Sequence, residues 1–268
     1  PQNEDLPGLF EKVAQDSGMV PGNEMVSVFE GLISNAETLF QDAFDVRPKA
    51  KVIVQGADLG GYYMPPAVDG SRPGIFYATI SSSVPKFNMP SLLYHETVPG
   101  HHYQIAISQE MNLLPLRRAL EFTGYTEGWA LYAERLMSEL GAYKDDPYGD
   151  LGRLQYEAFR AARLVVDTGI HDKKWSYDKA LEFMLENTGL GERELQYEIS
   201  RYIVLPGQAT AYDVGFIKIL ELRQKAKETL GDKFDLKEFH NVLLSNGALP
   251  LEILEKVVDN YIQQEMNS

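Results

Sequence analysis

The sequence contains no cysteine, which excludes disulfide bonds and thiolate metal sites. Histidine is scarce, with five in 268 residues, and no apolar run approaches the roughly 18 residues of a membrane-spanning helix. Basic residues are outnumbered by acidic ones, 25 to 39, and the formal net charge is −14. Because nucleic acids and anionic membranes repel such a charge, neither is expected as a partner.

The remaining composition is that of a globular protein, with 44% hydrophobic and 24% charged residues. A chain of this length suffices for one large domain or two small ones. It begins with Pro1, and the segment from Pro1 to Pro7 resembles a linker. We therefore expect a piece of a longer protein, whose signal peptide or lipid anchor would lie outside this sequence.

Apolar residues recur with helical periodicity through most of the chain, which predicts a mainly α-helical fold. Two runs with β character, Lys51–Val54 and Gly74–Ile80, predict a small β element near residues 50–81. Ser176 is a suitable N-cap for the helix that follows it. The expected helices cover residues 23–44, 147–168, 176–187, 191–203, 207–230, 235–246 and 250–265.

Three of the five histidines lie in one eight-residue window, His95-Glu96-Thr97-Val98-Pro99-Gly100-His101-His102, and the residues on both sides of it have a helical pattern. A helical His-Glu pair with another histidine one turn later is typical of zinc metalloproteases. The imidazoles bind Zn²⁺, and the glutamate acts as general base on water. The window therefore predicts a zinc site with His95 as a ligand and Glu96 as the base.

The second ligand is harder to assign, because it comes six or seven positions after His95 instead of four. Ligating nitrogens must lie within roughly 4 Å of each other. On a straight helix, His102 would be about 10.5 Å from His95 along the helix axis. His101 would be about 240° from His95 around that axis. Pro99 cannot continue the helix, and Gly100 can adopt a positive φ at low cost. We expect a kinked or looped helix that returns His101, or less favourably His102, to His95.

Glu127 is the predicted third ligand. Helical periodicity follows it and Thr126 is a suitable cap, so Glu127 is expected in the first turn of a helix. An acidic residue at that position is also favoured by the helix dipole alone. A chain that ends one helix near Glu110 and then turns back would place Glu127 opposite the histidines. His95, His101 and Glu127 would then form a His₂Glu set with one position open for water.

Four motifs together carry a family resemblance. They are His95-Glu96-x-x-Pro99-Gly100-His101-His102-x-Gln104, Glu127-Gly128-Trp129-Ala130-Leu131-Tyr132-Ala133-Glu134, Arg163-Leu164-Val165-Val166-Asp167-Thr168-Gly169-Ile170-His171 and Pro206-Gly207-Gln208-Ala209-x-x-Tyr212-x-x-Gly215. They resemble the bacterial family catalogued as domain of unknown function 885, from about Gly60 to the C-terminus. The resemblance implies that residues 1–268 form a single domain, the C-terminal catalytic portion of a longer protein.

The resemblance also implies a helical zincin-like fold, akin to the angiotensin-converting-enzyme and oligopeptidase group. In that group the metal is held by His-Glu-x-x-His and by a glutamate on a later helix. The two extra residues of the present motif leave the choice between His101 and His102 open. The substrates of the resembled family are largely undefined, so the resemblance indicates a reaction class rather than a substrate.

Several other residues are candidates to act on the substrate. Zincins of the resembled group take the oxyanion donor from a tyrosine or histidine on a later helix, and the segment around Tyr212 resembles the corresponding oligopeptidase segment. Tyr212 is the expected donor and His171 the alternative, although the first could simply pack and the second could interact with a helix C-terminus. Arg160 and Arg163 could bind a substrate carboxylate or pair with acidic side chains. Residues 75–81 could align an extended peptide, or form a core strand.

These residues predict a zinc-dependent hydrolase with one Zn²⁺ ion. Peptides are the expected substrates, because a His₂Glu site with Glu96 as base suits amide cleavage. The alternatives are an amidase or esterase on other small molecules and a non-catalytic, metal-stabilised binding module. Glu96 favours catalysis, since structural sites are usually closed by four protein ligands and do not need an adjacent carboxylate. His240 is expected in the core or on the surface rather than at the metal.

The expected partners are a peptide or small amide substrate and the missing N-terminal half of the same protein, which we expect to pack on this chain. A bacterial cell-envelope or periplasmic location is favoured over the cytoplasm, which stays open.

Overall fold

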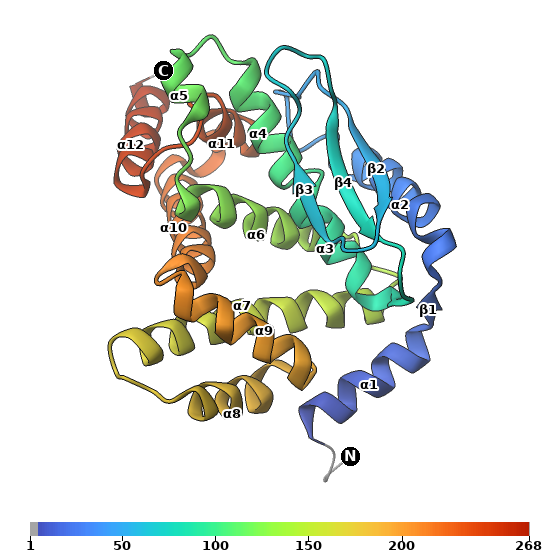
Figure 1. Ribbon diagram of the computed structural model, residues 1–268. Coiled ribbons are helices and arrows are strands. Elements are labelled where there is room, and N and C mark those ends of the chain that lie inside the picture. Colours follow the sequence, from blue (N-terminus) through green and yellow to red (C-terminus); the bar gives the residue numbers. More distant parts are fainter. Residues whose placement is uncertain (1–4, 268) are drawn as a thin grey trace.

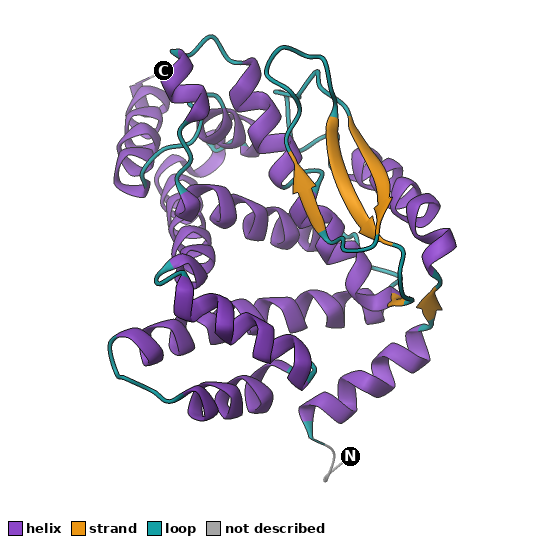
Figure 2. Cartoon of the chain, in the orientation of Figure 1, coloured by secondary structure: helices purple, strands orange, loops and turns teal. Residues whose placement is uncertain are grey.

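The computed structural model describes residues 5–267 and is about 66% helical, with only small sheets. Figures 1 and 2 show the three-stranded sheet at one edge of the molecule, with α2 beside it and most of the other helices on its other side. The expected class, mainly α with a small β element, is confirmed. The elements are α1 Leu6–Ser17, β1 Met19–Val20, α2 Met25–Leu39, β2 Val52–Ala57, β3 Tyr62–Met64, β4 Gly74–Thr79, β5 Val84–Pro85, α3 Met89–Glu96, α4 His101–Glu110, α5 Pro115–Ala119, α6 Thr123–Glu139, α7 Pro147–His171, α8 Tyr177–Thr188, α9 Glu192–Val204, α10 Gln208–Leu230, α11 Leu236–Leu244 and α12 Leu251–Asn267, with 3₁₀ turns at Gly22–Glu24, Lys86–Asn88 and Gly231–Lys233.

The sheet has three strands in the order β2-β4-β3, and β1 pairs separately with β5. β2 runs parallel to β4, and β3 runs antiparallel to it. Helix α2 packs on this sheet, where the rings of Phe29 and Phe76 are 4.8 Å apart. Because β4 is the middle strand, both of its backbone edges are already paired. Of the two alternatives for residues 75–81, the core strand is therefore confirmed over residues 75–79 and pairing with a substrate is wrong, and the short edge strand β3 had not been expected.

Most helix starts follow from local sequence. Ser176 Oγ accepts from the backbone N–H of Lys179, as expected for a cap, and Asp146 caps α7 in the same way. The bounds of α7 to α12 differ from the expected ones by at most three residues. Helix α1 begins at Leu6, inside the segment expected to be a linker, whereas Pro1–Glu4 lie outside the described residues.

Helix α2 is shorter than its apolar periodicity predicts. It ends at Leu39, and Phe40 and Phe44 leave the helix to pack around the ring of Tyr103, with centroids 5.4 and 4.9 Å away. The same residues that continue the helical pattern are therefore buried in another way. Tertiary packing overrides the local periodicity here.

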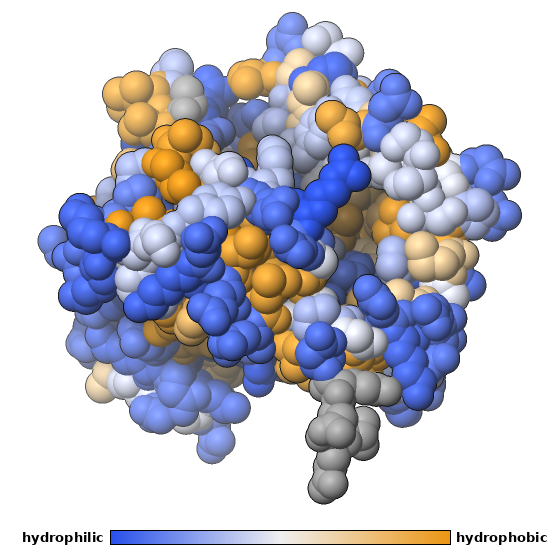
Figure 3. Space-filling view, turned by 60° about the horizontal axis from the view of Figure 1, so that its bottom comes forward, coloured by the Kyte–Doolittle hydropathy of each residue, from blue (hydrophilic) through white to orange (hydrophobic). Residues whose placement is uncertain are grey.

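Buried apolar side chains form two clusters. The larger surrounds α6 and α10 and includes Tyr125, Trp129 and Tyr132, and the smaller lies between α7, α8 and α9. Figure 3 shows the face that carries α1, α8 and α9, which is mostly hydrophilic with apolar residues gathered in its middle. Within residues 5–267, no helix is both long enough and apolar enough to cross a membrane.

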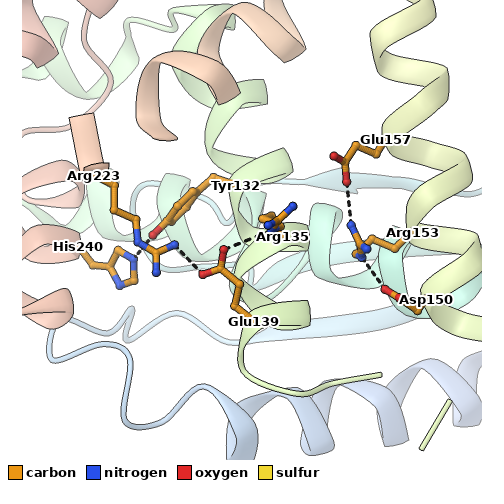
Figure 4. Close-up of polar contacts among 8 residues, drawn as sticks. All are labelled: Tyr132, Arg135, Glu139, Asp150, Arg153, Glu157, Arg223 and His240. Atoms are coloured by element: carbon orange, nitrogen blue, oxygen red, sulfur yellow. Dashed lines mark hydrogen bonds and ion pairs between the residues drawn. The ribbon is translucent and has the colours of Figure 1, made fainter. Parts of the chain in front are cut away.

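His240 belongs to the core. It donates from Nδ1 to the carbonyl oxygen of Ala43 at 2.8 Å, and its Nε2 accepts from the hydroxyl of Tyr132 at 2.7 Å. Figure 4 shows this contact beside the ion pair of Arg223 with Glu139. Burial lowers the pKa of His240 to about 4, so the imidazole is neutral. Both nitrogens are used inside the fold, in agreement with the expected core position.

Helices α6 and α10 cross with their backbones in contact. A Cβ atom on Gly128 would lie 2.4 Å from the carbonyl carbon of Gly215, and one on Gly215 would lie 1.6 Å from the carbonyl oxygen of Gly124. Only glycine permits this approach. The crossing fixes α10 against α6 and brings Tyr212, one turn before Gly215, toward the histidine cluster.

Candidate metal centre

His95 lies on α3, which is packed against α2, α6 and α7 near the middle of the molecule (Figure 1). Nearly all side chains of this helix are buried, and His95 itself is only 3% exposed. Pro90 stands in the first turn, where the missing N–H leaves no helical hydrogen bond unmade. The sequence thus presents a histidine from a rigid and almost fully enclosed helix.

The helix breaks after Glu96, as Pro99 predicts. Thr97 Oγ1 donates back into α3 at 2.7 Å, and the indole N–H of Trp129 donates to the carbonyl oxygen of Pro99 at 2.9 Å. Gly100 has φ −78° and ψ −128°, so the predicted positive φ is wrong. Position 100 requires glycine for a steric reason, because a Cβ atom there would lie 2.0 Å from the carbonyl oxygen of His95.

After the break, His101 and His102 point in different directions. The ring centroids of His101 and His95 are 4.7 Å apart. His102 turns toward the sheet, where its Nδ1 accepts from the Tyr63 hydroxyl at 2.9 Å and its Nε2 donates to Ala50 at 3.0 Å. Burial lowers the pKa of His102 to about 4. Both of its nitrogens are occupied, so of the two candidates only His101 faces His95.

Glu127 meets both imidazoles. It lies in the second turn of α6 rather than the first, because the helix begins at Thr123 and the expected cap at Thr126 is wrong. The Oε2 atom of Glu127 is 3.4 Å from Nε2 of His95 and 3.2 Å from Nε2 of His101. Ligand atoms placed ~2.0 Å from a tetrahedral zinc ion are separated by about 3.3 Å, so both carboxylate–imidazole distances fit pairs of zinc ligands.

Two further properties of this cluster fit a metal ion. The Oε2 atom of Glu127 is buried and has no well-formed hydrogen bond to a described residue, despite its two imidazole neighbours. Burial raises the pKa of Glu127, whereas the adjacent imidazoles lower it well below its usual value, so the carboxylate is ionised. Two imidazole nitrogens with one carboxylate oxygen are a donor set of catalytic zinc sites.

Glu134 contacts Nδ1 of His95, the nitrogen that does not face Glu127, and Ser91 contacts Glu134. Neither Glu134 nor Ser91 was given a role from the sequence. The carboxylate of Glu134 accepts from Nδ1 of His95 at 2.7 Å and from the hydroxyl of Ser91. Such a carboxylate behind a histidine is the usual outer partner of a metal ligand. The available signal was spacing, because Glu134 follows Glu127 by two helical turns and lies on the same face of α6.

The charge state of His95 reflects these neighbours. Burial lowers its pKa, but the contacts with Glu127 and Glu134 outweigh burial and raise the pKa to about 10. In the metal-free chain the imidazole is therefore a cation between two carboxylates. A metal ion would replace this proton, since a ligating imidazole must be neutral.

Glu96 lies next to the cluster. One ligand atom each from His95, Glu96 and His101 fall within 4.8 Å of one another. Burial raises the pKa of Glu96, and the attraction of His101 and His95 offsets this only in part. Glu127 is the better third ligand, because its oxygen stands at ligand distance from both imidazoles. Glu96 is then a further carboxylate beside the cluster, with a raised pKa.

Of the two candidate oxyanion donors, Tyr212 lies at the site and His171 has another contact. The ring of Tyr212 is nearly parallel to that of His95, with centroids 6.2 Å apart. His171, at the end of α7, donates from Nε2 to the carbonyl oxygen of Tyr202 on α9 at 3.0 Å. The structure thus brings His95, Glu96, His101, Glu127 and Tyr212 together.

A family model described as "Bacterial protein of unknown function (DUF885)" matches residues 2–258. A crystal structure described as a "putative lipoprotein" from Colwellia psychrerythraea is similar, with 46% identity and a TM-score of 0.88, over 90% of this chain and 43% of that one. A structure described as "a putative lipoprotein of unknown function" from Shewanella oneidensis has the same fold, with 22% identity and a TM-score of 0.84, over 96% of this chain and 50% of that one. The chain thus spans half the length of these proteins or less. No curated protein matches it.

Proposed function

We propose that this chain, which belongs to the bacterial DUF885 family of unknown function, is the catalytic portion of a zinc-dependent hydrolase that cleaves peptide bonds. The observation that carries the proposal is that Oε2 of Glu127 lies at zinc-ligand spacing from Nε2 of His95 and from Nε2 of His101. These three residues would hold the ion. When bound, zinc supplies Lewis acidity to a substrate carbonyl and lowers the pKa of water.

The ligand number supports catalysis over a structural role. Structural zinc sites usually have four protein ligands, whereas three leave a coordination position for water or substrate. Glu134, another acidic residue near the cluster, already forms hydrogen bonds with His95 and Ser91. Glu96 has no such hydrogen bond within residues 5–267. A site that only stabilises the fold does not explain why this carboxylate lies beside the cluster.

Glu96 is the proposed general base. Its carboxylate takes a proton from the attacking water and passes it to the nitrogen of the leaving amine. Burial raises its pKa, which makes it a stronger base than a solvent-exposed carboxylate. A peptide nitrogen is a poor leaving group until it is protonated, so this second transfer is required for amide cleavage.

Tyr212 is the proposed donor to the oxygen of the attacked carbonyl. Its ring lies beside His95, and Gln208 Nε2 is 3.4 Å from its hydroxyl. The Gly128–Gly215 crossing fixes α10 in this position, so the phenol is held by the fold rather than by a loop. Preorganised donors of this kind act mainly on the transition state.

The setting of the enzyme follows from its relatives. We infer a cell-envelope location, because the structure with 46% identity is of a protein described as a "putative lipoprotein". Both structural relatives are about twice as long as this chain or more. The remaining part of such a protein is proposed to pack on this one and to complete the substrate cleft.

Elemental analysis tests the metal assignment. The wild type and His102→Ala should each retain one zinc ion per chain, whereas His95→Ala and His101→Ala should lose it. His102→Ala is the matched control, because it removes the adjacent imidazole of the same helix. Equal zinc content in the wild type and His95→Ala would contradict the proposal.

Activity is tested separately with a mixed peptide library and mass spectrometry. The zinc-loaded protein should produce new peptide termini that are absent after metal removal and reappear when zinc is restored. If zinc binds as expected but no peptide bond is cleaved, small amides and esters become the next substrates to test.

A further inference from the structure

Arg160, on α7, is a buried cation that forms no ion pair within residues 5–267. Its side chain is only 8% exposed, and its Nε and Nη1 atoms are buried without a hydrogen bond. No ion pair joins Arg160 to another described residue. Arg153, two turns earlier on α7 and equally buried, contacts Asp150 at 2.8 Å and Glu157 at 2.7 Å (Figure 4). The two arginines therefore differ in partners rather than in depth.

Aromatic rings surround the guanidinium group of Arg160. Its Cζ atom lies 5.0 Å from the ring centre of Tyr156, 5.4 Å from that of Phe159 and 5.6 Å from that of Tyr212. These contacts hold the group in place but leave its N–H donors unused. Rings also exclude water, which strengthens any charge-assisted hydrogen bond formed there.

A second arginine reaches the same place. The Cζ atom of Arg163 lies 4.7 Å from the ring centre of Tyr212. Its Nη2 contacts Glu198 at 2.8 Å and its Nε donates to Tyr202, but Nη1 is buried without a partner. Both guanidinium groups therefore bring unused donors to the ring of Tyr212.

Tyr212 connects these arginines with the metal cluster. The ring of Tyr212 contacts the imidazole of His95. The guanidinium groups of Arg160 and Arg163 lie over the same ring. The positive charge of Arg160 acts on Glu96, Glu134 and Asp213, although none is close enough for an ion pair. The unused donors thus lie beside the ring of Tyr212, the proposed oxyanion donor.

We propose that Arg160, with Nη1 of Arg163, binds a carboxylate of the substrate close to the bond that is cleaved. The desolvation cost of a buried guanidinium with unpaired N–H donors is offset only in part by carboxylates beyond ion-pair distance, and a carboxylate bound directly to those donors would remove it. The substrate class is therefore peptides with a free C-terminal carboxylate or an acidic side chain beside the scissile bond. This inference rests on the proposed function, because it names the substrate of the same site.

Equilibrium binding tests it without turnover. Three probes are titrated calorimetrically into zinc-loaded protein: acetyl-Ala-Ala-Ala with a free carboxylate, its C-terminal amide, and acetyl-Ala-Ala-Glu amide. Glu96→Gln serves as the background so that the probes persist. At least one carboxylate probe should bind ~10-fold or more tightly than the uncharged amide, the scale of a charge-assisted hydrogen bond. The carboxylate probe that binds more tightly shows whether the site prefers a C-terminal carboxylate or an acidic side chain.

Variants on the same background decide whether Arg160 is responsible. Arg160→Gln should bind all three probes alike, whereas Arg153→Gln should keep the preference of its parent. Equal binding of the probes by the parent protein, or an undiminished preference in Arg160→Gln, would overturn the inference. The second result would indicate that the carboxylate binds zinc directly.

The zinc content of each variant separates binding from a structural role. If Arg160→Gln loses zinc, Arg160 balances the acidic cluster and the inference fails. If Arg160→Gln does not fold, Arg160→Lys decides, because it keeps the charge and loses the planar fork. A reduced preference in Arg160→Lys supports the inference, and an unchanged one overturns it. Because the readout is affinity, absence of peptide cleavage would contradict the proposed function and leave this result intact.

Discussion

Replacing Glu134 by glutamine is expected to weaken zinc binding while leaving the fold intact. The carboxylate of Glu134 accepts from Nδ1 of His95 at 2.7 Å and from Ser91. The amide oxygen of glutamine can still accept from His95, and its NH₂ group can donate to the Ser91 hydroxyl. No buried polar atom is therefore left unpaired, and what is lost is the negative charge behind the imidazole.

The expected loss follows from that charge. A hydrogen bond to a charged group contributes about 1.5–3 kcal/mol, and its neutral counterpart about 0.5–1.5 kcal/mol. The difference, of order 1–2 kcal/mol, corresponds to roughly 10-fold in affinity, within the 10–100-fold range usual for outer partners of metal ligands. Competition with a chromophoric zinc chelator at fixed pH measures the dissociation constant directly.

Glu139→Gln is the matched control. Glu139 lies on the same helix and pairs with Arg135 and Arg223, away from the histidines. It should bind zinc as the wild type does. An affinity of Glu134→Gln within about 3-fold of the wild type, which is less than about 0.7 kcal/mol, or an equal loss in Glu139→Gln, would refute the reasoning. Circular dichroism of the metal-free forms establishes that both variants fold.

Three further predictions follow from the same structure. Glu96→Gln should keep its zinc and lose at least ~10²-fold in turnover of a cleaved peptide, and near-normal turnover would refute its role as base. Tyr212→Phe should lower turnover with little change in substrate binding, by up to ~2.7–4 kcal/mol in activation free energy, and a change confined to KM would argue against an oxyanion donor. Because the folded-state pKa of His240, about 4, lies below its ordinary value of 6.5, its stabilising effect is complete above pH 6.5 and is lost as the pH falls toward 4. Urea unfolding of the metal-free protein at pH 7 and pH 5 should show roughly 2 kcal/mol more acid destabilisation in the wild type than in His240→Gln, and equal pH dependence would contradict the assignment.

The features that were predictable from the sequence are those set by nearby residues. The helices from α7 onward follow from apolar periodicity and from caps such as Ser176, which depend on neighbours within a few positions. The histidine window was recognisable for the same reason. The break at Pro99 was expected because proline ends a helix in almost any context, and the approximate place of Glu127 followed from the length of one returning helix.

The features that were missed depend on contacts between distant segments. Gly100 was expected to have a positive φ, but it is glycine because the carbonyl of His95 lies against it. The role of Glu134 required knowing that α3 and α6 face each other over two turns. Strand β3 exists because Tyr62–Met64 pairs with β4, more than ten residues later. The sequence does not predict that Arg160 forms no ion pair with a described residue, because α7 has acidic residues on both sides of it.

The glycine crossing of α6 and α10 limits how this protein can be made more heat-resistant. Alanine normally replaces a helix-interior glycine with a gain of up to about 1 kcal/mol. Gly31 of α2, which has open space around its Cα, suits that change. At Gly215 the same methyl group would meet the carbonyl oxygen of Gly124 at 1.6 Å and force α10 outward, together with Tyr212. Mutations that improve helix propensity at this crossing would therefore separate the two halves of the proposed active site, and thermostability must be sought elsewhere in the chain.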